Sequence, residues 1–310
     1  MGVKFVGFEA VAQGESHKEK DLPCQDAVLH KLYPLGGIAV VADGHGSEKH
    51  FRSGIGAEIA VRIVHEGIVD FSVLFKEDMP KGDIAVLNAY MEKQLDQLER
   101  FIITKWRQEV IEHYSANPPD EQEASICEKL NLDMADEKNR VRAYGTTLLA
   151  AMLQRKCWFA LQIGDGGSVR LDPDGNPSLA VPEDENLGFG RTTSLCDSNA
   201  KENFRHAFGF DETKGLTVAT DGVTDSFIPD AYLEFHKKLY ADFCNDPDTA
   251  AEGVKKGIVT WSIKGSRDDV SMAGIFATPA TDTIVDKAKD LLSSVMDRGA
   301  NSNLGGNYAG

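Results

Sequence analysis

Residues 40–46 read Val-Val-Ala-Asp-Gly-His-Gly and end an apolar run that begins at residue 37. Such a run of small and β-branched residues predicts a buried strand. Asp43 and His45 follow at once, and the glycines beside them let the backbone turn sharply. The sequence therefore places a carboxylate and an imidazole side by side at the tip of a strand.

The same pattern recurs later in the chain. Residues 216–222 read Leu-Thr-Val-Ala-Thr-Asp-Gly, and a further apolar stretch, residues 157–163, leads to Asp165. A single aspartate at a turn commonly does no more than bind nearby amides. Several carboxylates gathered in one cleft, however, repel one another unless a cation compensates. A hard ion with oxygen ligands, Mg²⁺ or Mn²⁺, is the physical remedy.

Composition limits the classes of protein to consider. The 310 residues are 42% hydrophobic, enough for a core, and carry 33 basic against 49 acidic side chains, a formal net charge of −16. This balance argues against a nucleic-acid or anionic-membrane partner, which requires clustered Lys and Arg. The five cysteines show no C-x-x-C spacing, so a zinc site or a disulfide scaffold has no support. Neither a signal peptide nor a membrane-spanning run is recognisable, and we expect a cytoplasmic protein.

Hydrophobic periodicity predicts alternating helices and strands. Apolar residues recur at three- and four-residue steps over residues 84–114, which predicts a long helix whose aromatic residues pack in the core rather than bind a cofactor. Asn117-Pro-Pro then stops it. The remaining expected elements are helices at 51–69, 231–243 and 248–259, a short helix and loop at 120–140, loops at 13–23 and 182–207, and strands at 3–11, 24–29, 144–153, 157–163, 168–171, 206–210, 216–220 and 270–276.

No linker composition divides the first 280 residues, so we expect one domain over residues 1–280. Residues 281–310 are expected to form a further helix, to residue 297, and then a disordered tail. That tail is rich in Gly and Asn and has almost no apolar residues.

Several short motifs carry a family resemblance through their order and spacing. They are Ser16-His17, Pro23-Cys-Gln-Asp-Ala27, Ala42-Asp-Gly-His-Gly46, Gly145-Thr-Thr147, Ile163-Gly-Asp-Gly166, Thr192-Thr-Ser-Leu195, Ala219-Thr-Asp-Gly-Val-Thr-Asp225 and Ser266-Arg-Asp-Asp-Val-Ser271. Over about residues 3–277 the chain resembles the metal-dependent protein phosphatase 2C family. Within that family it is most similar to a bacterial branch with a Ser-His…Pro-Cys-Gln-Asp-Ala opening.

The resemblance implies an α+β fold, a phosphatase 2C-like α/β/β/α sandwich of two antiparallel sheets flanked by helices. It also implies two Mn²⁺ or Mg²⁺ ions at one end of the sandwich. Its implied metal ligands are Asp43, which bridges both ions, the carbonyl of Gly44, Asp221 and Asp268, and Asp26 directly or through a bound water.

Two further roles follow from matched positions. His45 would stand near the phosphoryl leaving oxygen as general acid, a task suited to a group that titrates near neutrality. Asp165 matches a position that the family links to a third, weaker metal. Asp43 and His45 are thus the expected catalytic residues.

The chain departs from the family pattern in three places. Many relatives carry a phosphate-gripping arginine five residues before the Asp26 position, where this chain has Asp21. His17, Lys18 or Lys20 could supply the cation, and we choose Lys20 as the substrate-binding residue; its alternative is a solvated loop charge. Gln25 replaces a Glu common in eukaryotic relatives. Asp269 stands where Asn is frequent, and is either a ligand or a loop residue.

We therefore expect a serine/threonine phosphoprotein phosphatase that uses a metal-activated water. Its expected partner is a phosphoprotein, for instance the target of a cognate Ser/Thr kinase in signalling. A hydroxyl nucleophile at Thr146, Thr147 or Ser266 is rejected, because no His-Asp pair stands ready to activate it. Two alternatives stay open: a catalytically weak scaffold or phosphoprotein-binding module, and a small-molecule phosphomonoesterase.

Overall fold

The structure is a computed structural model that describes residues 2–78, 82–182 and 192–280. The chain separates into two compact units. Residues 5–277 form the larger one, which carries the elements discussed below except the first two residues of β1 and the last two of β10. Of the described residues, 2–4 and 278–280 belong to the other, where Thr278 Oγ1 donates to the carbonyl of Lys4 at 3.2 Å. The predicted helix and tail at 281–310 lie outside the described residues, and so does the 183–191 part of the predicted long loop.

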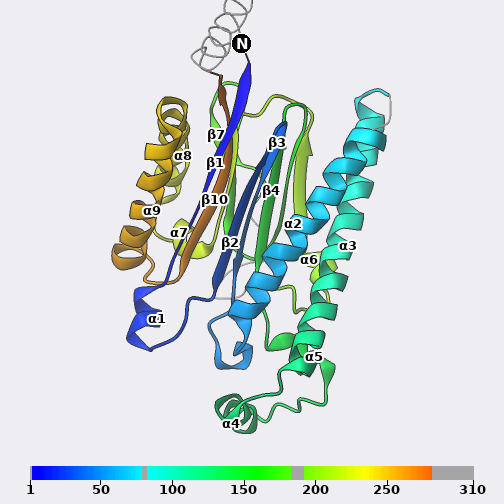
Figure 1. Cartoon of the computed structure of the whole chain (residues 1–310), viewed down its shortest axis with the longest axis vertical. Coiled ribbons are helices and arrows are strands. Elements are labelled where there is room, and N and C mark those ends of the chain that lie inside the picture. The colour runs from blue at the N-terminus through cyan, green and yellow to red at the C-terminus, as the bar shows by residue number, and fades with distance from the viewer. Residues whose placement is uncertain (1, 79–81, 183–191, 281–310) are drawn as a thin grey trace, which may run out of the picture. The chain divides into compact units, whose positions relative to one another are not determined.

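Two antiparallel five-stranded sheets form the centre of the fold (Figure 1). The first has the order β1-β10-β9-β6-β7 and the second the order β2-β3-β4-β5-β8. The strands are β1 (Val3–Ala12), β2 (Asp26–Tyr33), β3 (Gly36–Asp43), β4 (Leu148–Gln154), β5 (Trp158–Ile163), β6 (Gly167–Leu171), β7 (Pro177–Leu179), β8 (Arg205–Gly209), β9 (Gly215–Ala219) and β10 (Val270–Pro279).

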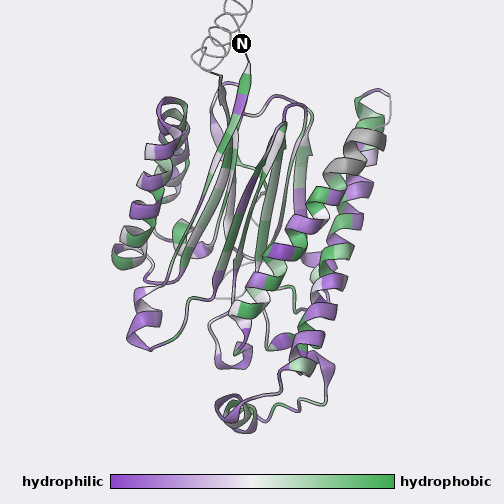
Figure 2. Ribbon diagram, in the orientation of Figure 1, coloured by the Kyte–Doolittle hydropathy of each residue, from purple (hydrophilic) through white to green (hydrophobic). Residues whose placement is uncertain are grey.

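Helices cover the outer face of each sheet, so the predicted α/β/β/α sandwich is confirmed. The pair α2 (Ser53–Asp78) and α3 (Ile84–Ala116) packs on the second sheet. The pair α8 (Pro229–Asn245) and α9 (Pro247–Lys264) lies beside the first sheet. In Figure 2 the central strands carry mostly hydrophobic residues, whereas the helices alternate between hydrophobic and hydrophilic ones, as expected of amphipathic helices in the outer layers.

The surroundings of strand β3 explain why its sequence is apolar without alternation. Its residues 39 and 41 belong to the cluster between the two sheets, together with Leu216 and Val218 of β9. Val40 and Ala42 point the other way, into the cluster beneath α2 and α3. Because both faces are buried, residues 38–42 are all apolar, and burying each Val side chain among them contributes about 1.5–3 kcal/mol.

The long helix α3 follows its predicted period. Asp83 caps its first turn by accepting hydrogen bonds from the backbone N–H groups of Ala85 and Val86, both at 3.1 Å. Trp106 is fully buried, and its indole donates to the carbonyl of Gly56 in α2 at 2.9 Å. Its predicted packing role is thus confirmed. None of the helices in the described ranges combines the length and the apolar character needed to cross a bilayer.

The structure corrects several predicted boundaries. The expected loop at 13–23 contains the short helix α1 (Glu15–Glu19), and the expected loop at 182–207 contains α6 (Ala200–Asn203) and the start of β8. Helix α2 runs nine residues beyond its predicted end at residue 69, to Asp78. Short polar helices leave no apolar period to detect. The remaining elements are η1 (Glu48–His50), α4 (Glu121–Lys129), α5 (Glu137–Arg142) and α7 (Asp221–Thr224).

Candidate active site

The antiparallel register of β2 and β3 sets Asp26 directly opposite Asp43. These two aspartates stand at the ends of adjacent strands, and the chain turns away behind Asp43 through Gly44. The backbone of Asp43 is held from the neighbouring strand, since the N–H of Thr147 donates to the Asp43 carbonyl at 2.8 Å and the hydroxyl of Thr146 donates to the same oxygen at 2.8 Å. The sequence run 145–147 therefore fixes the strand tip rather than supplying a nucleophile.

Gly44 occupies a space that admits no side chain. A Cβ there would lie 2.7 Å from the carbonyl oxygen of Gln25 and 2.7 Å from the carbonyl carbon of Ser53. The Gly44 N–H donates to that same Gln25 carbonyl at 3.1 Å. The glycine is thus required for the close approach of two backbone segments as well as for the turn.

The other sheet brings a third aspartate to the same place. Asp221 begins α7 directly after β9, and Thr220 before it links the sheets. The Thr220 hydroxyl donates to Asp26 Oδ2 at 2.9 Å and accepts from the backbone N–H of Ser271 at 3.0 Å. A single buried threonine thereby joins β2, β9 and β10 at the carboxylate cluster.

The carboxylates perturb one another strongly. Burial raises the pKa of Asp26 well above its usual value, and the charge of Asp269 adds to the rise. Burial also raises the pKa of Asp43, with the charge of Asp26 as the next cause. Burial and the charge of Asp165 raise the pKa of Asp221 to about 6. Desolvated like charges of this kind are characteristic of sites that hold cations.

Two of these carboxylate oxygens, Asp26 Oδ1 and Asp221 Oδ1, are buried and have no hydrogen-bond partner. Within the described ranges, no three or more His, Cys, Asp or Glu side chains are already arranged to hold an ion. The donor set nevertheless fits Mg²⁺ or Mn²⁺, because only oxygen ligands converge and the two unpartnered oxygens lack the compensation that an ion would give.

Both carboxylate oxygens of Asp269 have hydrogen-bond partners within the protein, which favours a structural role over a role as metal ligand. Its Oδ1 accepts from the N–H of Gly14 at 2.7 Å, and its Oδ2 accepts from the N–H of Gln25 at 2.6 Å and contacts His17 Nδ1 at 2.9 Å. Burial opposes ionisation, but the hydrogen bonds from His17 and these two amides hold the pKa of Asp269 below its usual value. Asp269 is therefore a positioning residue that fixes the segment before Asp26.

His45 lies in the cleft against a second histidine. The rings of His45 and His50 meet edge to face with centroids 4.8 Å apart, and His50 Nδ1 contacts the carbonyl of Arg142. Burial, together with the charges of His50 and Lys49, lowers the pKa of His45 to about 3. Burial therefore favours the neutral imidazole in this environment, and the role of His45 as general acid stays a prediction.

A cleft of about 1300 Å³ runs past these residues. Most of the predicted site residues line it: Asp43, His45, Asp165, Asp221 and Asp268. Lys20 is not among the lining residues; it is exposed at the end of α1, where its N–H donates to the carbonyl of His17 at 3.1 Å. Its assignment to the substrate stays a prediction.

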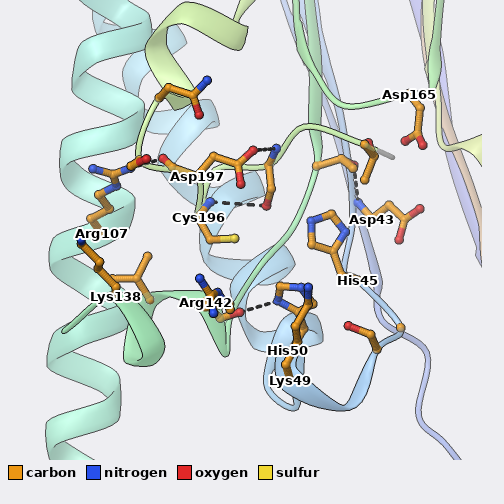
Figure 3. A pocket seen from close by; sticks show the side chains of 18 of the residues that line it. Asp43, His45, Lys49, His50, Arg107, Lys138, Arg142, Asp165, Cys196 and Asp197 are labelled. Carbon is orange, nitrogen blue, oxygen red and sulfur yellow. Dashed lines mark hydrogen bonds between the residues drawn. The ribbon is translucent and has the colours of Figure 1, made fainter. Parts of the chain in front are cut away.

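Sequence reasoning missed the basic side of the cleft. Lys49, Arg107, Lys138 and Arg142 line it, and Figure 3 shows them on the side of the pocket away from Asp43 and Asp165. Lys49 comes from η1, Arg107 from α3, and both Lys138 and Arg142 from α5. No sequence motif joins these three elements, so the fold brings them together.

Three solved structures are similar to this chain in fold. A structure described as a C. elegans sex determining protein is 15% identical, with a TM-score of 0.52, and the alignment covers 89% of this chain and 65% of that one. PppA of Pseudomonas aeruginosa, titled a key regulatory component of T6SS, is 14% identical over 89% of this chain and 99% of its own, with a TM-score of 0.49. The catalytic domain of the serine threonine protein phosphatase PstP, solved with 2 manganese ions, is 15% identical over 89% and 100%, also with a TM-score of 0.49.

Among curated proteins, no sequence matches the chain significantly. A family model described as protein phosphatase 2C matches residues 13–261, which is well over half of the chain. That range includes the opposed strand ends of Asp26 and Asp43 and the β9 tip at Asp221. The chain therefore belongs to the protein phosphatase 2C family.

Proposed function

We propose that this chain is a metal-dependent phosphatase that hydrolyses phosphoserine and phosphothreonine in proteins. The observation that carries the proposal is the cross-strand pair of Asp26 and Asp43, joined by Asp221 from the other sheet, with two buried carboxylate oxygens left without partners. Family membership supports the same reaction class.

Asp43 would help to hold the Mn²⁺ or Mg²⁺ ions. The other proposed ligands are the Gly44 carbonyl, Asp26, Asp221 and Asp268, and Asp165 would serve a third, weaker site. Such ions supply a water acidic enough to attack phosphorus at neutral pH. The protein's part is to hold the carboxylates in place: Asp269 anchors the strand entry, and Thr146 and Thr147 fix the tip of β3.

His45 would donate a proton to the departing Ser or Thr oxygen. Its imidazole is neutral in this environment, because burial opposes its charged form. A phosphate dianion in the cleft would favour the imidazolium, since a nearby opposite charge raises the pKa of a histidine. His45 would thus take up its proton as the substrate enters, which suits a general acid.

The partner in this proposal is a phosphoprotein, including the target of a cognate Ser/Thr kinase. A cytoplasmic location is part of the proposal as well. All five cysteines are free thiols, which suits a reducing compartment.

The test is hydrolysis of a phosphothreonine peptide with Mn²⁺, with and without chelator, by wild type and by Asp221→Asn. We expect turnover by the wild type that chelator abolishes. Loss of a ligand in Asp221→Asn should cost more than the roughly 10- to 100-fold that loss of an outer-shell partner costs. Asp174→Asn is the control, because Asp174 is an exposed residue of the turn between β6 and β7.

Equal activity in all four conditions would refute the metal mechanism. Absence of turnover on any phosphoester would favour the scaffold alternative. A higher kcat/KM on free phosphothreonine than on the peptide would favour the small-molecule alternative.

A further inference from the structure

The cleft is larger than a single phosphate requires. Its volume of about 1300 Å³ exceeds the 300–1,000 Å³ that is usual for small-molecule sites. Asp43 and Asp165 occupy one side of it, and Lys49, Lys138 and Arg142, which we name the basic wall, stand on the other (Figure 3). A ligand that used both sides would be an extended chain rather than a compact phosphoester.

The cations of the basic wall have no carboxylate partner in the part of the chain that the structure describes. All three side chains are exposed, and within the described ranges none lies within 4.0 Å of a carboxylate oxygen. Nearby cations differ in this respect: Arg52 pairs with Glu123 at 2.6 Å, and Lys129 pairs with Glu48 at 2.7 Å.

Neighbouring carboxylates do not neutralise the wall. Asp197 also lines the cleft, and its carboxylate accepts a hydrogen bond from the N–H of Ser194 at 2.9 Å. Its backbone carbonyl accepts a hydrogen bond from the guanidinium of Arg107. Glu137 lines the cleft as well, but forms no ion pair with the wall. The chain has a net charge of −16, yet three cations that pair with no carboxylate of the described residues line this one cleft. They make this part of the cleft locally positive.

The basic wall lies near His50 and apart from Asp43 and Asp165. Lys49 and Arg142 are among the charges that lower the pKa of His50. In Figure 3 Lys49, Lys138 and Arg142 lie on the side of the pocket away from Asp43 and Asp165. The wall is therefore placed to meet a charge beside the reacting phosphate rather than the reacting phosphate itself.

We propose that the basic wall binds a second anionic group on a phosphopeptide, an acidic side chain or a second phosphate close to the residue being dephosphorylated. This inference rests on the proposed phosphatase function. Carboxylate and phosphate share the chemistry that Lys and Arg recognise, through charge-assisted hydrogen bonds that are bidentate for Arg142. The substrate class would be phosphoproteins with acidic or multiply phosphorylated segments.

The test compares kcat/KM on three phosphothreonine peptides that differ only in the residues flanking the phosphothreonine: alanine, glutamate or phosphoserine. Two partly exposed ion pairs should give the wild type a preference of roughly three- to tenfold for the anionic peptides over the alanine peptide. Higher ionic strength should weaken that preference. A gain with phosphoserine alone would identify the second phosphate as the ligand, and a gain with both would include acidic side chains.

The double variant Lys138→Gln/Arg142→Gln should bring the ratio close to one. Neither side chain pairs with a carboxylate of the described residues, and the Arg142 carbonyl that contacts His50 remains. The matched control is Arg155→Gln/Lys156→Gln, which removes the same two charges from the exposed turn between β4 and β5, away from the cleft. This control should keep the wild-type ratio.

Three outcomes would overturn the inference: no preference in the wild type, an equal loss on all three peptides in the wall variant, or the same fall in ratio in the control. Turnover of an aryl phosphate by the wild type tests the proposed function separately, because that substrate has no second anionic group. Fluorescence anisotropy of the same peptides with chelator-treated protein keeps the inference testable without turnover. Equal affinities of wild type and wall variant for the doubly phosphorylated peptide would refute it there.

Discussion

Asp269→Asn tests whether a buried carboxylate holds the active-site strands in place. The native carboxylate accepts hydrogen bonds from the amides of Gly14 and Gln25 and contacts His17, and only 4% of the residue's surface is exposed. Asparagine offers one oxygen instead of two. Its best orientation keeps the Gln25 and His17 contacts and turns an NH₂ group toward the N–H of Gly14.

The magnitude follows from that geometry. One buried N–H loses its acceptor, which costs about 1–3 kcal/mol. The two hydrogen bonds that survive become neutral and lose roughly half their strength, or about 1 kcal/mol together. We therefore expect the free energy of unfolding to fall by about 2–4 kcal/mol.

Urea denaturation in chelator measures this change without a contribution from bound metal. Asp225→Asn is the matched control, because Asp225 is an exposed carboxylate near Asp165 and Asp268 whose charge is likewise removed. Its unfolding free energy should stay within about 0.5 kcal/mol of the wild type. A drop below 1 kcal/mol for Asp269→Asn, or an equal drop in the control, would refute the positioning role.

Two further predictions concern regions outside the cleft. Gly56→Ala should destabilise the protein by at least about 1–3 kcal/mol, because the new Cβ would lie 1.9 Å from the carbonyl oxygen of Tyr144 and α2 must shift; an unchanged thermal midpoint would contradict this. His206 contacts Glu99 at 2.6 Å and Glu92 at 2.9 Å, and the hydrogen bond to Glu99 is the main cause that raises its pKa above the usual value. The stabilisation that protonated His206 gives the folded state is thus fully present below the unfolded pKa of about 6.5, and it is lost as pH rises through the folded pKa. The unfolding free energy of the wild type, measured by urea titration, should therefore fall relative to that of His206→Gln as the pH rises through this range. The same pH dependence in both proteins would count against the ion pairs of His206.

The sequence alone determined the elements whose pattern is set by burial. Strand β3 is apolar from residue 38 to residue 42 because both of its faces are covered there. Helix α3 repeats apolar residues because only one of its faces is covered. Such local patterns need no knowledge of neighbours. The aspartates at strand tips belong to the same category, since a run of apolar residues that ends in Asp-Gly marks the tip by itself.

Tertiary structure decided everything that depends on which tips meet. The opposition of Asp26 and Asp43 comes from strand register, and the link from Asp26 to Thr220 spans 194 positions of sequence. The hydrogen bonds that occupy Asp269, the lowered pKa of His45 and the basic wall likewise arise from contacts between distant segments. Burial, charge neighbours and hydrogen-bond partners are properties of three-dimensional packing, and no local pattern of residues encodes them.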